Sequence, residues 1–332
     1  MRELLAKLIE TYGPAGVEDN ISDVIRKEIE DYVDEIETDI MGNLIAVKRG
    51  DEGGKRVMLS AHMDQIGLMV TYIDENGFLR FSNIGGINVL NTINNKVIFQ
   101  NGTIGTVSYE SEITDIKEIK LDRMYIDIGA TSLEEASEKI SIGDVAVYYS
   151  PLKESGGRYI GGAMDNRASC ALLIQAIKDL KDCKHDAYFV FSAQEEVGLR
   201  GARTSAYAID PDIGIAVDVT ATGDTPKART MAVKLGEGPT VKIKDASVIC
   251  HPKVKDMLID TAKRENIPYQ LEVLEWGGTD TGAIHLTKEG VPSGAVSIPC
   301  RYIHSANEMV DDKDIKYGAK LIVAVLENQI EL

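Results

Sequence analysis

Two adjacent acidic residues, Glu195 and Glu196, directly follow an apolar, strand-like run at 187–193. Buried strands normally end in turn residues, so a pair of acids at this point indicates a positively charged partner. Similar arrangements recur at four further places: His62 and Asp64 after 57–61, Asp165 after a glycine-rich approach, Asp218 after 213–217, and His304 after 295–298. Open α/β sheets bind ligands beyond the carboxyl ends of their strands, so this pattern favours an α/β fold with a site at one sheet edge.

Helical and strand-like patterns alternate along the last half of the chain. The predicted helices are 167–180, 254–265 and a closing one near 315–327, and strands are predicted at 187–193, 213–217, near 270 and at 295–298. This alternation is typical of a mostly parallel sheet flanked by helices. His185 stands in a charged stretch of this half, and we expect it at the surface.

The segment from 67 to 158 differs from the rest of the chain in its residue pattern. Short β-rich runs separated by Gly and Asn turns dominate it, and only 133–139 has a helical pattern. Many short strands with few helices predict a small β-barrel or sandwich. We therefore expect a catalytic domain formed by 1–66 and 159–332, with 67–158 as an inserted β-rich domain.

The overall charge excludes some classes of partner. The chain has 36 basic and 53 acidic residues, a formal net charge of -17, which disfavours binding to nucleic acid or to an anionic membrane surface. Residues 1–10 lack the apolar core of a signal peptide, and no run approaches the ~20 apolar residues of a spanning helix. These observations predict a cytoplasmic protein.

Histidine and carboxylate side chains that meet at one sheet edge are typical metal ligands. The candidates are two imidazoles and three carboxylates: His62, Asp165, Glu196, Asp218 and His304. One divalent ion cannot use all five and keep a position open for substrate, whereas two ions about 3.5–4 Å apart can share a carboxylate and a bridging water. Mixed oxygen and nitrogen ligands suit Zn, Co or Mn.

Two further acids have predicted roles beside the metals. Asp64 follows His62 by two positions and can accept a hydrogen bond from the second ring nitrogen, which would fix the tautomer of the imidazole. Glu195 is left as a carboxylate next to the metals but not bound to them, where it can act as a general base toward the bridging water.

The motifs resemble those of the M42 family of metallo-aminopeptidases over nearly the whole chain. The resemblance is carried by His62-Met63-Asp64, Gly162-Ala163-Met164-Asp165-Asn166-Arg167, Glu195-Glu196-Val197-Gly198, Val217-Asp218, Gly277-Gly278-Thr279-Asp280 and Arg301-Tyr302-Ile303-His304-Ser305. It implies that Asp165 bridges two metal ions, Zn or Co, and that Glu195 is the general base. It also implies that His62 and Asp218 complete one metal site, and that Glu196 and His304 complete the other.

The same resemblance implies a fold of the dinuclear zinc-peptidase type and peptides as substrates. It implies that 67–158 mediates dimerisation and that dimers assemble into a hollow tetrahedral dodecamer. A cis peptide bond between Asp165 and Asn166 is expected as well.

Two other functions remain as alternatives. Relatives in this family have often been labelled β-1,4-glucanases, but a sugar-binding groove would be expected to offer aromatic platforms, and this chain has one Trp and 6% aromatic residues. A non-catalytic assembly protein with structural metals is the second alternative, and the open coordination of mixed His and carboxylate ligands disfavours it. The preferred first residue of the peptide, whether acidic, basic or apolar, is left open.

Overall fold

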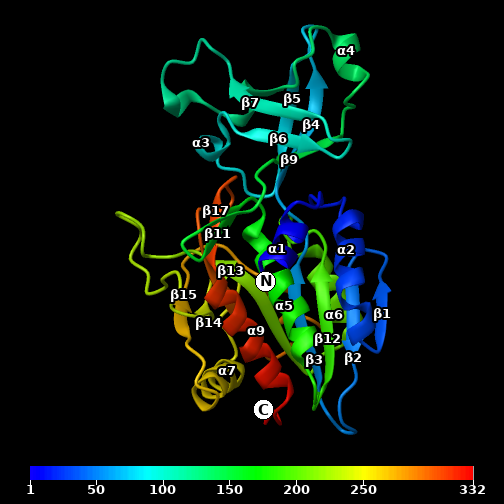
Figure 1. Ribbon diagram of the computed structural model, residues 1–332, viewed down its shortest axis with the longest axis vertical. Coiled ribbons are helices and arrows are strands. Elements are labelled where there is room, and N and C mark those ends of the chain that lie inside the picture. The colour runs from blue at the N-terminus through cyan, green and yellow to red at the C-terminus, as the bar shows by residue number, and fades with distance from the viewer. Residues whose placement is uncertain (332) are drawn as a thin grey trace.

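A computed structural model describes residues 1–331, and its largest element is an eleven-stranded sheet (Figure 1). The centre of this sheet consists of four mutually parallel neighbours in the order β12 (Asp186–Ser192), β3 (Arg56–His62), β13 (Ile213–Thr220) and β16 (Ser293–Arg301). Seven further strands extend it: β1 (Glu35–Thr38), β2 (Leu44–Lys48), β10 (Lys153–Ser155), β11 (Arg158–Gly161), β14 (Thr240–Lys244), β15 (Gln270–Val273) and β17 (Glu308–Asp311). The predicted α/β class with a parallel central sheet is confirmed.

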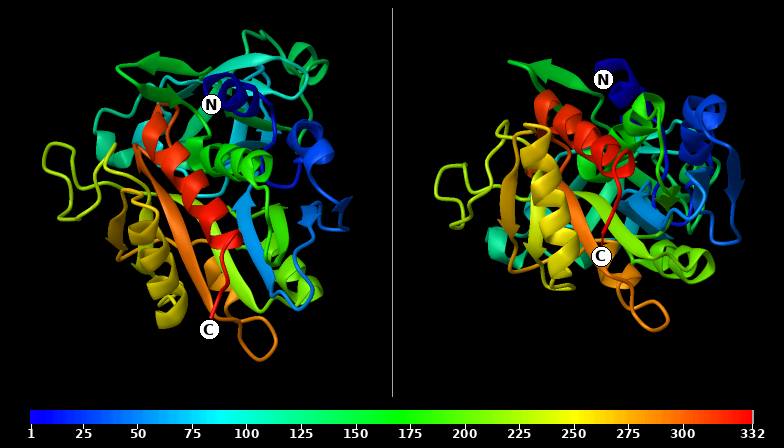
Figure 2. Two further views of the ribbon diagram at one scale, coloured as in Figure 1. Left: turned by 60° about the horizontal axis from the view of Figure 1, so that its bottom comes forward. Right: turned by 90° about the horizontal axis from the view of Figure 1, so that it is seen from below.

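Helices cover both faces of the sheet because its central strands are apolar on both sides. Val57 and Leu59 of β3 belong to the larger core, whereas Met58 between them packs into a second, smaller core on the opposite face. The larger core is covered by α1 (Arg2–Ile9), α2 (Asp19–Ile29), α5 (Met164–Asp179), α7 (Pro252–Arg264) and α9 (Asp312–Leu326). The smaller core is covered by α6 (Arg200–Ile209) and α8 (Thr281–Ile284). Figure 2 shows α9 lying beside α5, on the same face of the sheet.

A closed six-stranded barrel stands apart from the large sheet, at the top of Figure 1. Its strands are β4 (Gly67–Ile73), β5 (Leu79–Ile84), β6 (Lys96–Phe99), β7 (Ile104–Tyr109), β8 (Met124–Asp127) and β9 (Val145–Tyr148). The short helices α3 (Val89–Thr92) and α4 (Leu133–Ser137) and three 3-10 turns complete the described elements, the turns being Glu30–Tyr32, Ile116–Glu118 and Leu121–Arg123. The barrel has a hydrophobic core of its own, in which Leu79, Val107 and Ile126 are fully buried.

One sequence-based expectation about the surface is wrong. His185 is buried, with 1% of its surface exposed, although its sequence neighbours are charged. Its Nδ1 accepts a hydrogen bond from the backbone N–H of Lys55 at 3.2 Å, and its Nε2 lies 3.0 Å from the carbonyl oxygen of Asn328. The imidazole therefore joins the start of β3 to the segment after α9. Among residues 1–331, no helix is long and apolar enough to cross a lipid bilayer.

Candidate metal centre

The fold brings the predicted ligands together at the carboxyl edge of the parallel strands. His62 ends β3, Asp218 lies near the end of β13, and Asp165 is at the start of α5. Glu196 lies in the loop after β12, and His304 lies in the loop between β16 and β17. His62, Glu196 and Asp218 lie at or near the ends of β3, β12 and β13, which run parallel, so these three residues reach the same edge of the sheet.

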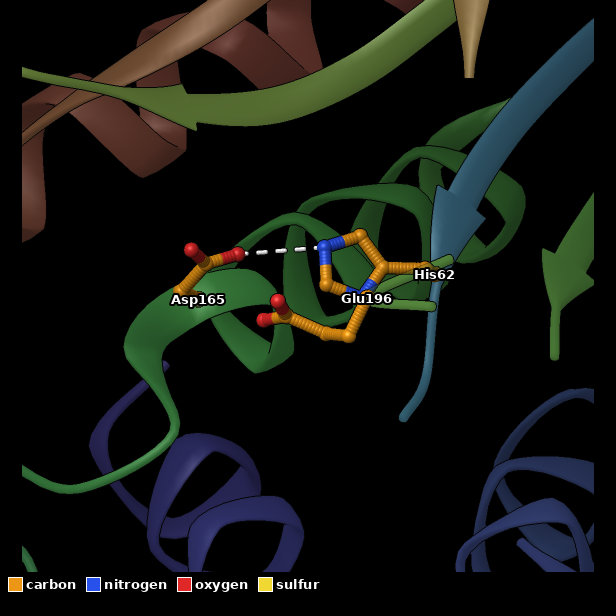
Figure 3. A group of neighbouring side chains, drawn as sticks. All are labelled: His62, Asp165 and Glu196. Carbon is orange, nitrogen blue, oxygen red and sulfur yellow. Dashed lines mark hydrogen bonds and ion pairs between the residues drawn. The ribbon is translucent and has the colours of Figure 1, made fainter. Parts of the chain in front are cut away.

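Asp165 stands between the two histidines. Its Oδ1 lies 3.1 Å from Nε2 of His62, and its Oδ2 lies 3.3 Å from Nε2 of His304. Nε2 of His304 is also 3.3 Å from Oε2 of Glu196. Figure 3 shows the side chains of His62, Asp165 and Glu196 converging from a strand, a helix start and a loop on one space.

Two overlapping groups of side chains are close enough to hold a metal ion. His62, Asp165 and Glu196 form one group, and His62, Glu195 and Asp218 form the other, with the potential ligand atoms of each group within 4.8 Å of one another. Oε2 of Glu195 is 3.9 Å from Nε2 of His62, and Oδ1 of Asp218 is 3.7 Å from it. Glu195, predicted as a base and not as a ligand, thus lies within reach of the same space.

The electrostatics of the centre favour a bound cation. Burial, together with nearby carboxylates such as Asp218, raises the pKa of Glu195 well above its ordinary value. Burial also raises the pKa of Asp218 far above its usual value. Oε1 of Glu196 is buried and has no hydrogen-bond partner within residues 1–331. Crowded carboxylates with an unsatisfied oxygen are stabilised when positive charge lies between them, so the donor set fits divalent metal ions.

The carboxylate of Asp64 forms hydrogen bonds with the backbone of Glu195 and Glu196, and it lies farther from the imidazole of His62. Its two carboxylate oxygens accept hydrogen bonds from the backbone N–H groups of Glu195, at 3.0 Å, and Glu196, at 3.1 Å. Nδ1 of His62 lies 3.1 Å from the backbone carbonyl oxygen of Asp64 and 3.5 Å from its carboxylate. The contact predicted for the imidazole is therefore made mainly by the carbonyl, and the carboxylate fixes the loop after β12.

Glu308 is a site residue that the sequence reasoning missed. Its Oε2 accepts a hydrogen bond from the backbone N–H of Asp165 at 3.0 Å, and its Oε1 accepts one from the backbone N–H of His304 at 2.7 Å. Burial, followed by repulsion from the Asp165 carboxylate, raises the pKa of Glu308 to about 8. The sequence feature that could have indicated Glu308 is its position at the start of a strand, four residues after His304.

The peptide bond between Asp165 and Asn166 is cis, as expected. The side-chain amide of Asn166 donates a hydrogen bond to the carbonyl oxygen of Val217 at 3.0 Å, immediately before Asp218. The start of α5 is thereby joined to the end of β13, and both segments carry a candidate ligand.

The barrel also contributes to the centre, through the loop after β5. A Cβ atom added to Gly86 would lie 2.7 Å from Nδ1 of His304, and one added to Gly85 would lie 3.0 Å from Oε2 of Glu196. Only glycine fits such close approaches without displacing the imidazole or the carboxylate. These two contacts were absent from the sequence-based expectations.

A family model described as M42 glutamyl aminopeptidase matches residues 42–321 of the chain. A putative aminopeptidase of Acetivibrio thermocellus is 53% identical, with 98% of each chain covered. A lysyl aminopeptidase of Pyrococcus furiosus is 36% identical, with 98% of this chain and 96% of the relative covered.

Solved structures of similar proteins share the whole fold. Aminopeptidase APDkam598 from Desulfurococcus kamchatkensis has a TM-score of 0.95 at 37% identity, with 98% of this chain and 94% of that chain covered. The TET1 peptidase of Pyrococcus horikoshii, which assembles into a tetrahedron or a large octahedral shell, has a TM-score of 0.86 at 33% identity, with 98% of each chain covered. An endoglucanase from Thermotoga maritima has a TM-score of 0.83 at 33% identity, with 97% and 96% covered.

Proposed function

The chain belongs to the M42 glutamyl aminopeptidase family, and from this membership we propose that it is a peptide hydrolase with two divalent metal ions, Zn or Co, at the candidate metal centre. It is an aminopeptidase, which removes residues from the N-termini of peptides. The observation that carries the two-metal proposal is the position of Asp165, whose two carboxylate oxygens face His62 and His304.

The proposed ligand sets share Asp165. His62 and Asp218 would complete one site, and Glu196 and His304 would complete the other, within a fold of the dinuclear zinc-peptidase type. Divalent ions held there supply Lewis acidity, which polarises a scissile carbonyl and stabilises developing negative charge. Asp64 and Glu308 hold three backbone segments in place by accepting hydrogen bonds from the N–H groups of Asp165, Glu195, Glu196 and His304.

Glu195 carries the proton transfers in this proposal. Its carboxylate lies beside His62 and Asp218, at the edge of the space between the candidate ligands. From this position it takes a proton from the attacking water and delivers it to the leaving amine.

The two alternatives explain fewer of these features. Glycoside hydrolysis generally uses a pair of carboxyl groups that flank the sugar bond, whereas the acids here alternate with two histidines at ligand distance. A purely structural metal site would be expected to be closed by its protein ligands, but this centre borders a cavity of about 660 Å³.

The relatives support a homo-oligomer, since the TET1 peptidase with the same fold assembles into closed shells. We propose that the inserted unit at 67–158 mediates dimerisation and that dimers form a dodecamer. The barrel stands apart from the large sheet, at one end of the molecule, which is where a second copy could meet it (Figure 1).

The test uses the full chain stripped of metal by a chelator and then reloaded with Zn²⁺ or Co²⁺. Activity on aminoacyl p-nitroanilides is expected to vanish on stripping and to return on reloading. Glu195→Gln should lower kcat by at least about 10²-fold while metal content, measured by elemental analysis, stays unchanged. Glu75→Gln, at an exposed barrel turn, is the control and should retain full activity.

Two results would contradict the proposal. Undiminished activity of the Glu195→Gln enzyme would remove Glu195 from the proton-transfer role. Hydrolysis of soluble cellulose derivatives by the reloaded protein, with every amide left intact, would favour the glucanase alternative.

A further inference from the structure

The cavity at the metal centre is lined by both acidic and apolar residues. Its volume is about 660 Å³, which is in the range of small-molecule pockets. The acidic residues are carboxylates of the candidate metal centre, among them Glu195. The apolar lining residues, which together we call the apolar wall, are Leu199, Val219, Ala246, Leu274, Trp276 and Ile303.

Trp276, the aromatic residue of the apolar wall, contacts a cationic side chain that does not line the cavity. The guanidinium of Arg229 lies 4.4 Å from the ring centroid of Trp276, a cation–π contact. The segment that carries Arg229 is itself tied down, because Asp224 accepts two hydrogen bonds from the guanidinium of Arg301, at 3.0 Å and 2.6 Å. Trp276 therefore presents a positioned apolar surface.

None of the side chains of the apolar wall is charged, so the wall cannot form an ion pair with a charged substrate side chain. Among the cavity-lining residues of the described chain there is no lysine or arginine. Lys242, which does not line the cavity, is fully buried and forms ion pairs with Glu272 and, at 3.4 Å, with Asp245. An acidic side chain entering here would lose its hydration without gaining a counter-charge from the residues that line the cavity.

Basic side chains also fit this wall poorly. The carboxylates that could attract them, such as Glu196 and Asp218, are candidate metal ligands, whose negative charge bound metal ions would neutralise. A lysine ammonium directed toward Trp276 and Leu274 would be desolvated against apolar carbon. Large apolar side chains, in contrast, gain free energy in proportion to the area that they bury.

We propose that the apolar wall receives the side chain of the N-terminal residue and that the enzyme prefers large aliphatic or aromatic first residues over acidic or basic ones. This inference rests on the proposed function of the metal centre. It differs both from the family description, which is glutamyl, and from the lysyl aminopeptidase relative.

The experiment compares kcat/KM of the metal-reloaded full chain for Leu, Phe, Glu, Lys and Ala p-nitroanilides. The Leu and Phe substrates are expected to exceed the Glu and Lys substrates by at least about tenfold. Trp276→Ala should lower kcat/KM for Leu and Phe by about tenfold or more and change it little for Ala. Leu274→Lys should raise the Glu-to-Leu ratio, because it adds the missing counter-charge.

Tyr207→Ala removes an exposed aromatic residue outside the cavity, and this control should leave every ratio unchanged. Dipeptides of the forms X-Ala and Ala-X separate the first residue from the second. Preference for apolar X only in Ala-X would overturn the proposal, because the wall would then bind the leaving peptide.

Fastest cleavage of the Glu or Lys substrate would also overturn the proposed preference, while the aminopeptidase function would stand. Hydrolysis of none of the substrates by the reloaded protein would overturn the proposed function itself, and the inference with it.

Discussion

At the scale of single residues, two buried carboxylates organise the metal centre without being candidate ligands. Asp64 accepts hydrogen bonds from two adjacent N–H groups in the loop after β12. Glu308 accepts them from Asp165 and His304, which belong to separate elements. Each of the two side chains thus fixes two backbone positions.

We expect Glu308→Gln to weaken metal binding. The substituted amide nitrogen cannot accept a hydrogen bond, so the N–H of either Asp165 or His304 loses its partner. Loss of a residue that orients metal ligands typically costs about 10–100-fold in affinity. The affinity for Zn²⁺ can be measured by competition with a chromogenic chelator.

Glu289→Gln, at an exposed position, is the matched control and should bind Zn²⁺ as the unmodified chain does. Equal affinities of all three proteins would show that Glu308 does not position the ligands. A thermal unfolding curve for each protein establishes that the fold is intact.

The convergence of His62, Glu196 and Asp218 could be expected from the sequence, because residues at the ends of parallel strands meet at one edge. Their roles as ligands stay predictions. Glu308 and Gly86 could not be found in this way. Both act through contacts with His304, and those contacts depend on how distant segments pack.

At the scale of elements, α6 lies so close to the end of β12 that only glycine fits at the contact. A Cβ on Gly201 would lie 2.7 Å from the backbone nitrogen of Ala193 and even closer to its carbonyl oxygen and to Asn43. The N–H of Gly201 donates a hydrogen bond to that carbonyl oxygen at 2.9 Å. The helix thereby supports the strand end that precedes the acidic pair.

Gly201→Ala should destabilise the protein by about 1–3 kcal/mol, because the methyl group meets backbone atoms that cannot move aside. Gly162→Ala is the control, since its Cβ would be in ordinary contact, 3.7 Å from Cβ of Ser150. Urea denaturation monitored by circular dichroism measures both changes. A Gly201→Ala protein as stable as the control would show that α6 can shift freely.

A pH dependence is expected where α9 begins. Asp314 is buried and accepts hydrogen bonds from the N–H groups of Gly236 and Gly238. Burial raises its pKa from 3.8 to about 6, so the folded protein binds a proton more tightly than the unfolded chain does. The contribution of Asp314 to stability is therefore highest below pH 4, falls as the pH rises from 4 to 6, and is constant above.

Between pH 4 and pH 6, the contribution of Asp314 to the free energy of unfolding decreases by up to about 3 kcal/mol. It is measured as the difference in free energy of unfolding between the unmodified chain and Asp314→Asn, which cannot titrate, across pH 4–7. A difference that does not change with pH would contradict the assignment to Asp314.

The sequence predicted the long helices and central strands well, because their apolar periodicity is strong. The predicted helix 254–265 corresponds to α7 (Pro252–Arg264), and the predicted run 213–217 lies within β13. Helix α6 was missed because its buried face consists of small residues, Gly201, Ala202, Ser205 and Ala206, which give no apolar pattern.

At the scale of the whole molecule, charge opposes the association of identical copies. Each 36.2-kDa chain carries a formal net charge of -17 at pH 7. We expect the homo-oligomer to dissociate at a higher protein concentration in 10 mM salt than in 150 mM salt, because screening weakens the mutual repulsion.

Light scattering on serial dilution measures the particle mass at both salt concentrations. A mass of one chain under all conditions would contradict the proposed oligomer. A mass that is independent of salt would show that apolar contacts alone determine assembly.

The loop after β5 brings the barrel into contact with the candidate metal centre, apart from the role proposed for the barrel in dimerisation. Gly85 and Gly86 come from the barrel, yet they touch Glu196 and His304 of the large α/β unit. A tilt of the barrel would therefore be transmitted directly to the imidazole and the carboxylate. In evolutionary terms, the barrel and the metal centre are linked, because a substitution that moves the loop after β5 would also displace the side chains of Glu196 and His304.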